Sequence, residues 1–98
     1  MEIKITGRHQ HLEGHAQDYL REKLGKLAHL AERLECAEVV VDHTPDGQRV
    51  EVVVLAPRGQ RFVAHADAAD LRTAIDLCEA KLAAQVRAFK DRQSSHRS

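Results

Sequence analysis

The chain has 98 residues, a formal net charge of zero and 43% hydrophobic residues, values that indicate a single globular domain with a modest core. No apolar run approaches the roughly 18 residues of a membrane span, and the N-terminus has no signal-peptide core, so we expect a cytoplasmic protein without a membrane partner. Zero net charge excludes nucleic-acid binding by bulk positive charge, so any such binding must depend on segregated basic residues.

The first two elements are predicted from two different periodicities. Residues 2–6 alternate polar and apolar side chains, which predicts a strand with Ile3 and Ile5 on its buried face. From Gly14 to Leu34 apolar residues recur at three- and four-residue steps, which predicts a helix. Gly25 inside this segment costs about 1 kcal/mol relative to Ala, so the helix must depend on packing.

Three strands should follow, because alternating apolar residues are separated by two turn sequences. Thr44–Gly47 and Pro57–Gly59 combine Pro, which fixes φ, with Gly, which accepts positive φ, and each predicts a hairpin turn. The inward-facing sets are Ala37, Val39 and Val41, then Val50, Val52 and Val54, then Phe62, Ala64 and Ala66.

A second helix is predicted from Asp70 to Arg92, with the Asp70 carboxylate capping the backbone N–H of Thr73. Its buried side should carry Leu71, Ile75, Cys78, Leu82, Val86 and Phe89. Residues 93–98 are polar and predict a flexible tail, so that residues 1–92 form the domain.

The resulting order, βαβββα, predicts an α+β fold. A strand, a crossover helix and a second strand favour a parallel pair, whereas the two short turns make the remaining pairs antiparallel. We expect one four-stranded mixed sheet with both helices on one face, similar to the βββα core of double-stranded RNA-binding domains. The other face should be open and partly apolar, through Val40, Val53, Leu55 and Val63.

Catalytic and metal-binding patterns are not recognisable in the sequence. The seven histidines do not show the paired spacing of a zinc site, and Cys36 and Cys78 lie far apart without a secretory context, which favours reduced thiols. No nucleophile motif or phosphate-binding glycine loop occurs. We therefore expect no enzyme activity, no metal, no cofactor and no small-molecule substrate.

Basic residues gather toward the C-terminus. From Ala80 onward five basic residues face a single acidic one, Asp91, which gives this segment a net charge of +4. The residues by themselves leave two interpretations open, an ordinary solvated helix end and a surface that contacts a polyanion.

Three stretches of the sequence carry a resemblance to a known family: EIKITGRH at the N-terminus, LREKLGKL in the first helix and TAIDLCEAKLAAQ in the second. Together with the βαβββα order they resemble the short form of the ribosome hibernation-promoting factor and ribosome-associated inhibitor family. The resemblance implies a stress-response protein that binds the small ribosomal subunit between head and body. There it would cover the mRNA and tRNA sites, inhibit translation and favour ribosome dimers.

The resemblance also implies which side chains would contact ribosomal RNA phosphates. The matching positions are Lys23, Lys26, Lys81, Lys90 and Arg92, with Arg8 as a weaker addition. Relatives commonly carry basic residues where this chain has Ala84 and Ala88, and Arg87 is the nearby cation that would substitute. The resemblance therefore implies fewer phosphate contacts than are typical of the family.

Two further hypotheses remain open. The open sheet face predicts a protein–protein interaction module, with weak self-association as one form of it. The likeness of the last three strands and helix to a double-stranded RNA-binding domain predicts a general RNA duplex binder.

Overall fold

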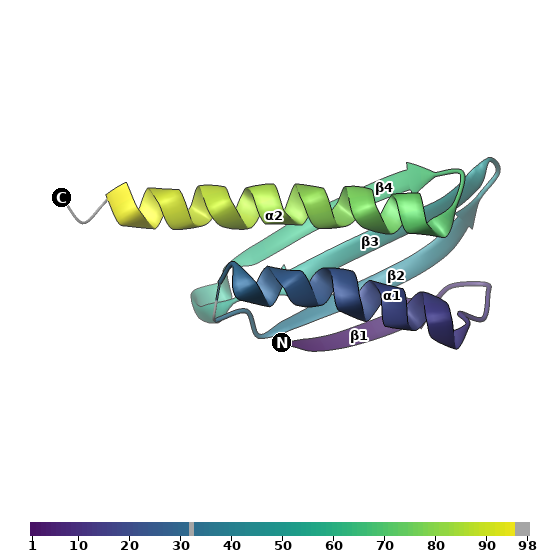
Figure 1. Cartoon of the computed structure of the whole chain (residues 1–98), viewed down its shortest axis with the longest axis horizontal. Coiled ribbons are helices and arrows are strands. Elements are labelled where there is room, and N and C mark those ends of the chain that lie inside the picture. Colours follow the sequence, from purple (N-terminus) through teal and green to yellow (C-terminus); the bar gives the residue numbers. More distant parts are fainter. Residues whose placement is uncertain (32, 96–98) are drawn as a thin grey trace.

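The computed structural model describes residues 1–31 and 33–95. Its elements are β1 (Glu2–Gly7), α1 (Gly14–Gly25), the 3₁₀ turn η1 (Lys26–His29), β2 (Cys36–Thr44), β3 (Gly47–Leu55), the 3₁₀ turn η2 (Pro57–Gly59), β4 (Arg61–Ala68) and α2 (Leu71–Ser95) (Figure 1). The predicted order βαβββα is confirmed.

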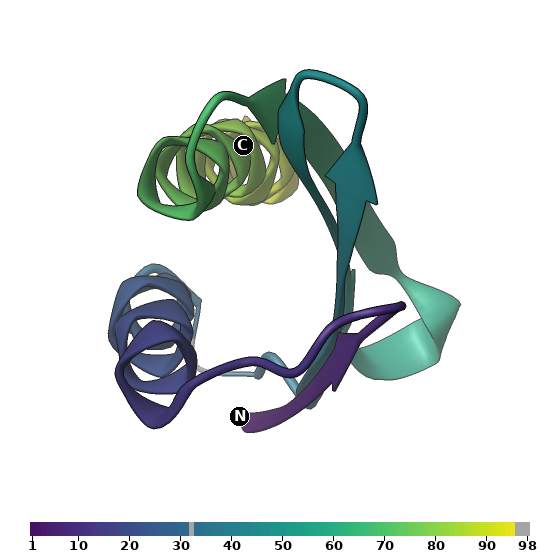
Figure 2. The same ribbon diagram turned by 90° about the vertical axis from the view of Figure 1, so that its right-hand side faces the viewer.

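The four strands form one mixed sheet in the order β1-β2-β3-β4. β1 and β2 are parallel, whereas β2–β3 and β3–β4 are antiparallel. Figure 2 shows both helices on the same side of the sheet, so that one sheet face is covered and the other is open. The predicted α+β class, with two helices on one face, is confirmed. Within the described residues no helix combines the length and the apolar character that a membrane span requires.

The core lies between the sheet and the two helices. The nine residues predicted to face inward from β2, β3 and β4 are all buried, with exposed fractions of 5% or less. The rings of Phe62 and Phe89 meet edge to face at 5.6 Å and close the core at one end. Ile3 and Ile5 are half-buried because β1 is an edge strand.

The first helix is shorter than its hydrophobic pattern predicts. α1 ends at Gly25 and continues as the tighter turn η1, instead of running to Leu34. Gly25 has low helix propensity, and 3₁₀ turns commonly finish helices at such points. Leu27 remains buried in η1, so the apolar periodicity survives although the α-helix does not. Part of the predicted segment, residue 32, lies outside the described residues.

Gly47 has a different role from the one that its turn sequence predicts. Among the described glycines only Gly59, with φ of 75°, has a positive φ. A Cβ atom on Gly47 would instead lie 2.2 Å from the carbonyl oxygen of Ala68. Gly47 is required for the close approach of two backbones at the end of the β3–β4 pair.

The second helix begins as predicted and ends later. The Asp70 carboxylate accepts a hydrogen bond of 2.8 Å from the Thr73 backbone N–H, which confirms the predicted cap. α2 continues to Ser95, so residues 93–95 are helical and do not belong to the expected tail, whereas residues 96–98 lie outside the described residues. With 25 residues α2 is about 37 Å long and projects beyond the sheet (Figure 1).

Candidate nucleic-acid interface

The two helices run in the same direction, so their C-terminal ends lie at the same end of the molecule (Figure 1). Along α2 the charges are segregated: Leu71–Ala80 carries Arg72 against two acidic residues, and 81–93 carries four basic residues against Asp91. The end of the molecule at which both helices finish is therefore the basic end of α2. Six of the seven predicted contact residues lie on these helical segments.

Lys23 lies between the two helices and has a protein partner. Its Nζ is 3.5 Å from Oδ1 of Asp76 on α2, and this carboxylate raises the pKa of the Lys23 ammonium group. The Tyr19 hydroxyl donates a 2.5 Å hydrogen bond to the same oxygen, which raises the pKa of Tyr19. The guanidinium of Arg72 lies 4.5 Å from the Tyr19 ring centroid. Lys23 therefore belongs to a polar network that joins α1 to α2.

Lys90 of α2 contacts the chain directly after η1. Its ammonium group donates a hydrogen bond to the carbonyl oxygen of Leu30, directly after η1. A cation at this position satisfies a carbonyl that the helical turn leaves without an intrahelical partner. Lys90 thus stabilises the end of η1 while remaining exposed to solvent.

Lys81 and Gln85 contact the outer edge of β4. Lys81 Nζ donates a 2.8 Å hydrogen bond to the His65 carbonyl oxygen. The Gln85 amide donates to the Val63 carbonyl at 2.7 Å and accepts from the Val63 N–H at 3.2 Å. These contacts were not predicted. The four-residue spacing of Lys81 and Gln85 places both on one side of α2, but the strand that they reach depends on the sheet order.

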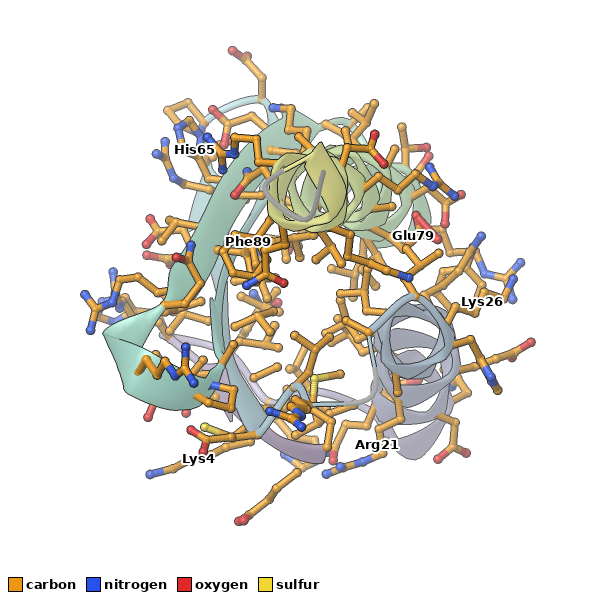
Figure 3. The ribbon with its side chains drawn as sticks, turned by 90° about the vertical axis from the view of Figure 1, so that its left-hand side faces the viewer. Lys4, Arg21, Lys26, His65, Glu79 and Phe89 are labelled. Carbon is orange, nitrogen blue, oxygen red and sulfur yellow. The ribbon has the colours of Figure 1, made fainter. Side chains whose placement is uncertain are left out.

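Lys26 and Arg87 are exposed, and neither makes a hydrogen bond or ion pair with another described residue. Figure 3, which views the molecule from the C-terminal end of α2, shows Lys26 pointing away from the core and Phe89 pointing into it. Arg92 is exposed near the end of α2, beyond the last apolar residue of the helix.

Arg8 lies apart from the other predicted residues. It follows β1 and pairs with Asp42 of β2 at 3.5 Å, at the opposite end of the sheet from the C-terminus of α2 (Figure 1). The structure therefore places six of the seven predicted residues on the helical segments, with Lys23 between the two helices and Lys81 beside β4, and it separates Arg8 from them.

A shallow hollow lies between the N-terminal ends of α1 and α2, away from the basic end. Its lining includes His15, Tyr19, Asp70, Arg72 and Ile75.

Within residues 1–31 and 33–95, no three His, Cys, Asp or Glu side chains gather closely enough to hold a metal ion.

Solved structures share this fold over nearly the whole chain. A ribosomal subunit interface protein from Coxiella burnetii matches with a TM-score of 0.86, at 21% identity, over 93% of this chain and 99% of that one. The N-terminal domain of Thermus thermophilus Protein Y matches with a TM-score of 0.82, at 32% identity, over 91% of this chain and 99% of that one.

Relatives in sequence carry a common name. The ribosome hibernation promoting factor of Pseudomonas putida is 30% identical over 95 residues, which cover 97% of this chain and 92% of that protein. The factor of the same name from Acidithiobacillus ferridurans is 35% identical over 78% of this chain and 100% of its own length. The family model described as Sigma 54 modulation protein / S30EA ribosomal protein matches residues 3–94. The chain belongs to this family.

Proposed function

We propose that this protein is a ribosome hibernation factor that binds the small ribosomal subunit in the decoding-region cleft. By occupying that cleft it blocks the mRNA and tRNA sites, holds idle ribosomes inactive during stress and favours their pairing. The activity is occlusion and not catalysis, and it places the protein in the cytoplasm. Family membership and the shared name of its relatives support this proposal.

The observation that carries the proposal is the shared basic end of α1, η1 and α2. Lys26 and Arg87 present their charges to solvent, and both lie on helical segments whose backbones are fixed by the core. Around Arg87 the exposed residues Ala84 and Ala88 are small, so an RNA backbone can approach the helix closely. Such a surface recognises the shape of a folded RNA through its phosphates and requires no base contacts.

The internal contacts of Lys23, Lys81 and Lys90 are compatible with phosphate binding. An ammonium group has three N–H donors, and each of these lysines uses at least one for a protein oxygen. The remaining donors stay available, while the internal contact restricts the side chain to a narrow set of positions. Such a lysine loses less conformational entropy on binding than a freely rotating one.

The test is co-sedimentation of the purified protein with vacant ribosomes at two salt concentrations. The double variant Lys26→Glu, Arg87→Glu should weaken binding roughly tenfold or more and flatten the salt dependence, because phosphate contacts release counterions. The matched control, Arg58→Glu with Arg61→Glu, makes the same change of charge at the β3–β4 turn and should bind like the wild type.

Three outcomes contradict parts of the proposal. Equal binding by the helix variant and the wild type would exclude the contact assignment, and absence of ribosome binding by the wild type would exclude the function. A short RNA duplex that competes as well as an equal mass of ribosomes would favour a general duplex binder.

A further inference from the structure

The outer edge of β4 is covered by side chains of α2. β4 is the last strand of the sheet, and the outward N–H and C=O groups of such a strand are available for pairing with another chain. Gln85 satisfies both groups of Val63, since its amide donates at 2.7 Å and accepts at 3.2 Å. A side-chain amide carries one carbonyl and N–H donors, so Gln85 makes the two hydrogen bonds that a residue of a neighbouring strand would make.

Lys81 extends this cover by one position along the strand, through its hydrogen bond to the His65 carbonyl. Lys81 and Gln85 are one helical turn apart, about 6 Å, and Val63 and His65 are two strand residues apart, about 6.8 Å. Because the two spacings nearly match, adjacent turns of α2 can serve adjacent edge positions of β4. We call the two side chains the edge cap.

Exposed apolar residues lie on both sides of the edge cap. Among the described residues, the exposed large hydrophobic residues are Val63, at 51%, and Leu77, at 44%. Val63 is the strand residue that Gln85 contacts, and Leu77 is four residues before Lys81 on the same side of α2. Exposed apolar surface beside an unpaired strand edge is characteristic of a surface that can pair.

When two copies of this chain pair through β4, oppositely charged residues lie at facing positions. If two β4 strands pair antiparallel about a two-fold axis at Ala64, Val63 lies opposite His65 of the second copy, and Arg61 lies opposite its Asp67. Oppositely charged residues at facing positions stabilise antiparallel pairs, and the two-fold axis makes each such pair occur twice. The side chain of Asp67 pairs with Arg49 at 3.5 Å and is 55% exposed, so it remains accessible to a second cation.

We propose that Lys81 and Gln85 close the β4 edge against antiparallel pairing with β4 of a second copy of this chain. The wild-type protein is then a monomer, and the edge cap is what keeps it so. This inference stands on the contacts of β4 and α2 and is independent of ribosome binding.

The test is the mass of the full chain in solution, measured by size-exclusion chromatography with light scattering over a range of concentrations. The wild type should be a monomer, and Lys81→Ala with Gln85→Ala should form a dimer whose fraction rises with concentration. Adding Val63→Lys to the double variant should restore the monomer, because each lysine would face His65 of the second copy and the two lysines would be diagonal neighbours across the two-fold axis. Lys26→Ala with Arg87→Ala removes two long side chains away from β4 and should stay monomeric.

Hydrogen exchange provides a second measurement that does not require the double variant to fold. In Gln85→Ala the Val63 amide should exchange faster than in the wild type, whereas amides in the β2–β3 pair should not change. The proposal is wrong if the folded double variant stays monomeric, if the wild type is itself a dimer, or if Val63→Lys leaves the association intact. An unchanged exchange rate of the Val63 amide would contradict it equally.

Discussion

Among single residues, the basic side chains differ by their surroundings and not by their type. Lys23 and Lys26 are one helical turn apart, yet Lys23 faces Asp76 of α2 whereas Lys26 points to solvent (Figure 3). Periodicity could predict that both lie on the first helical segment. It could not predict the partner of Lys23, because Asp76 is distant in the sequence and is brought near only by the packing of α2 against α1.

The two cysteines should differ in reactivity. Cys78 is buried, and burial raises the pKa of its thiol to about 11, so little thiolate is present at pH 8. Cys36 is half-buried at the start of β2. Iodoacetamide at pH 8 should therefore label Cys36 in the folded protein and Cys78 only in urea, as measured by mass spectrometry of the intact chain and its peptides. Equal labelling of both cysteines in the folded state would contradict the burial of Cys78.

The cap of α2 should make stability depend on pH in a defined direction. The hydrogen bond from the Thr73 N–H lowers the pKa of Asp70 below its ordinary 3.8, so the carboxylate is preferred in the folded state. The stabilisation is therefore complete above the ordinary pKa and is lost as pH falls through the lowered value. Asp70→Ala should lower the melting temperature at pH 7, and the difference from the wild type should shrink at pH 2. A difference that is independent of pH would show that the charge of Asp70 is unimportant.

Among the secondary-structure elements, features that depend on neighbouring residues in the sequence were predicted correctly, whereas features that depend on distant residues were not. The inward sets of β2, β3 and β4 were predicted correctly because alternation along a strand is local. The predicted end of α1 was wrong because the apolar pattern continues past Gly25, whereas the backbone changes there to the tighter turn η1. The role of Gly47 was missed because its constraint comes from Ala68 of another strand.

A pair of glycine substitutions tests this distinction. Gly47→Ala would place its Cβ 2.2 Å from the Ala68 carbonyl oxygen and should destabilise the protein by about 1–3 kcal/mol. At Gly25 no described atom outside the adjacent residues and the helix's own backbone lies within 4 Å of the added carbon, so Gly25→Ala should stabilise the protein by up to about 1 kcal/mol. Urea unfolding followed by circular dichroism measures both. Equal changes in the two variants would exclude the close approach at Gly47.

For the whole molecule, the net charge is zero, but the positive and negative charges are unevenly distributed. The sequence predicted the segregation along the second helix, and the structure adds that α1 and η1 finish at the same end. An uneven charge distribution orients a protein in the field of a polyanion and raises the rate of productive encounters, an effect that salt screens. The contacts that Lys26 and Arg87 make with ribosomal RNA stay a prediction, which the paired charge-reversal variants address.

The projecting end of α2 has a geometric consequence for what it can enter. The C-terminal end of α2 extends past the sheet (Figure 1), and successive residues of a helix are rotated by about 100°. Arg87 and Arg92 therefore point in directions about 140° apart, and Lys90 and Arg92 about 160° apart. A helix end with cations on several sides binds a flat anionic surface weakly, because such a surface contacts one side of the helix at a time. We therefore expect a channel with phosphates on facing walls to satisfy these cations better than a flat anionic surface does.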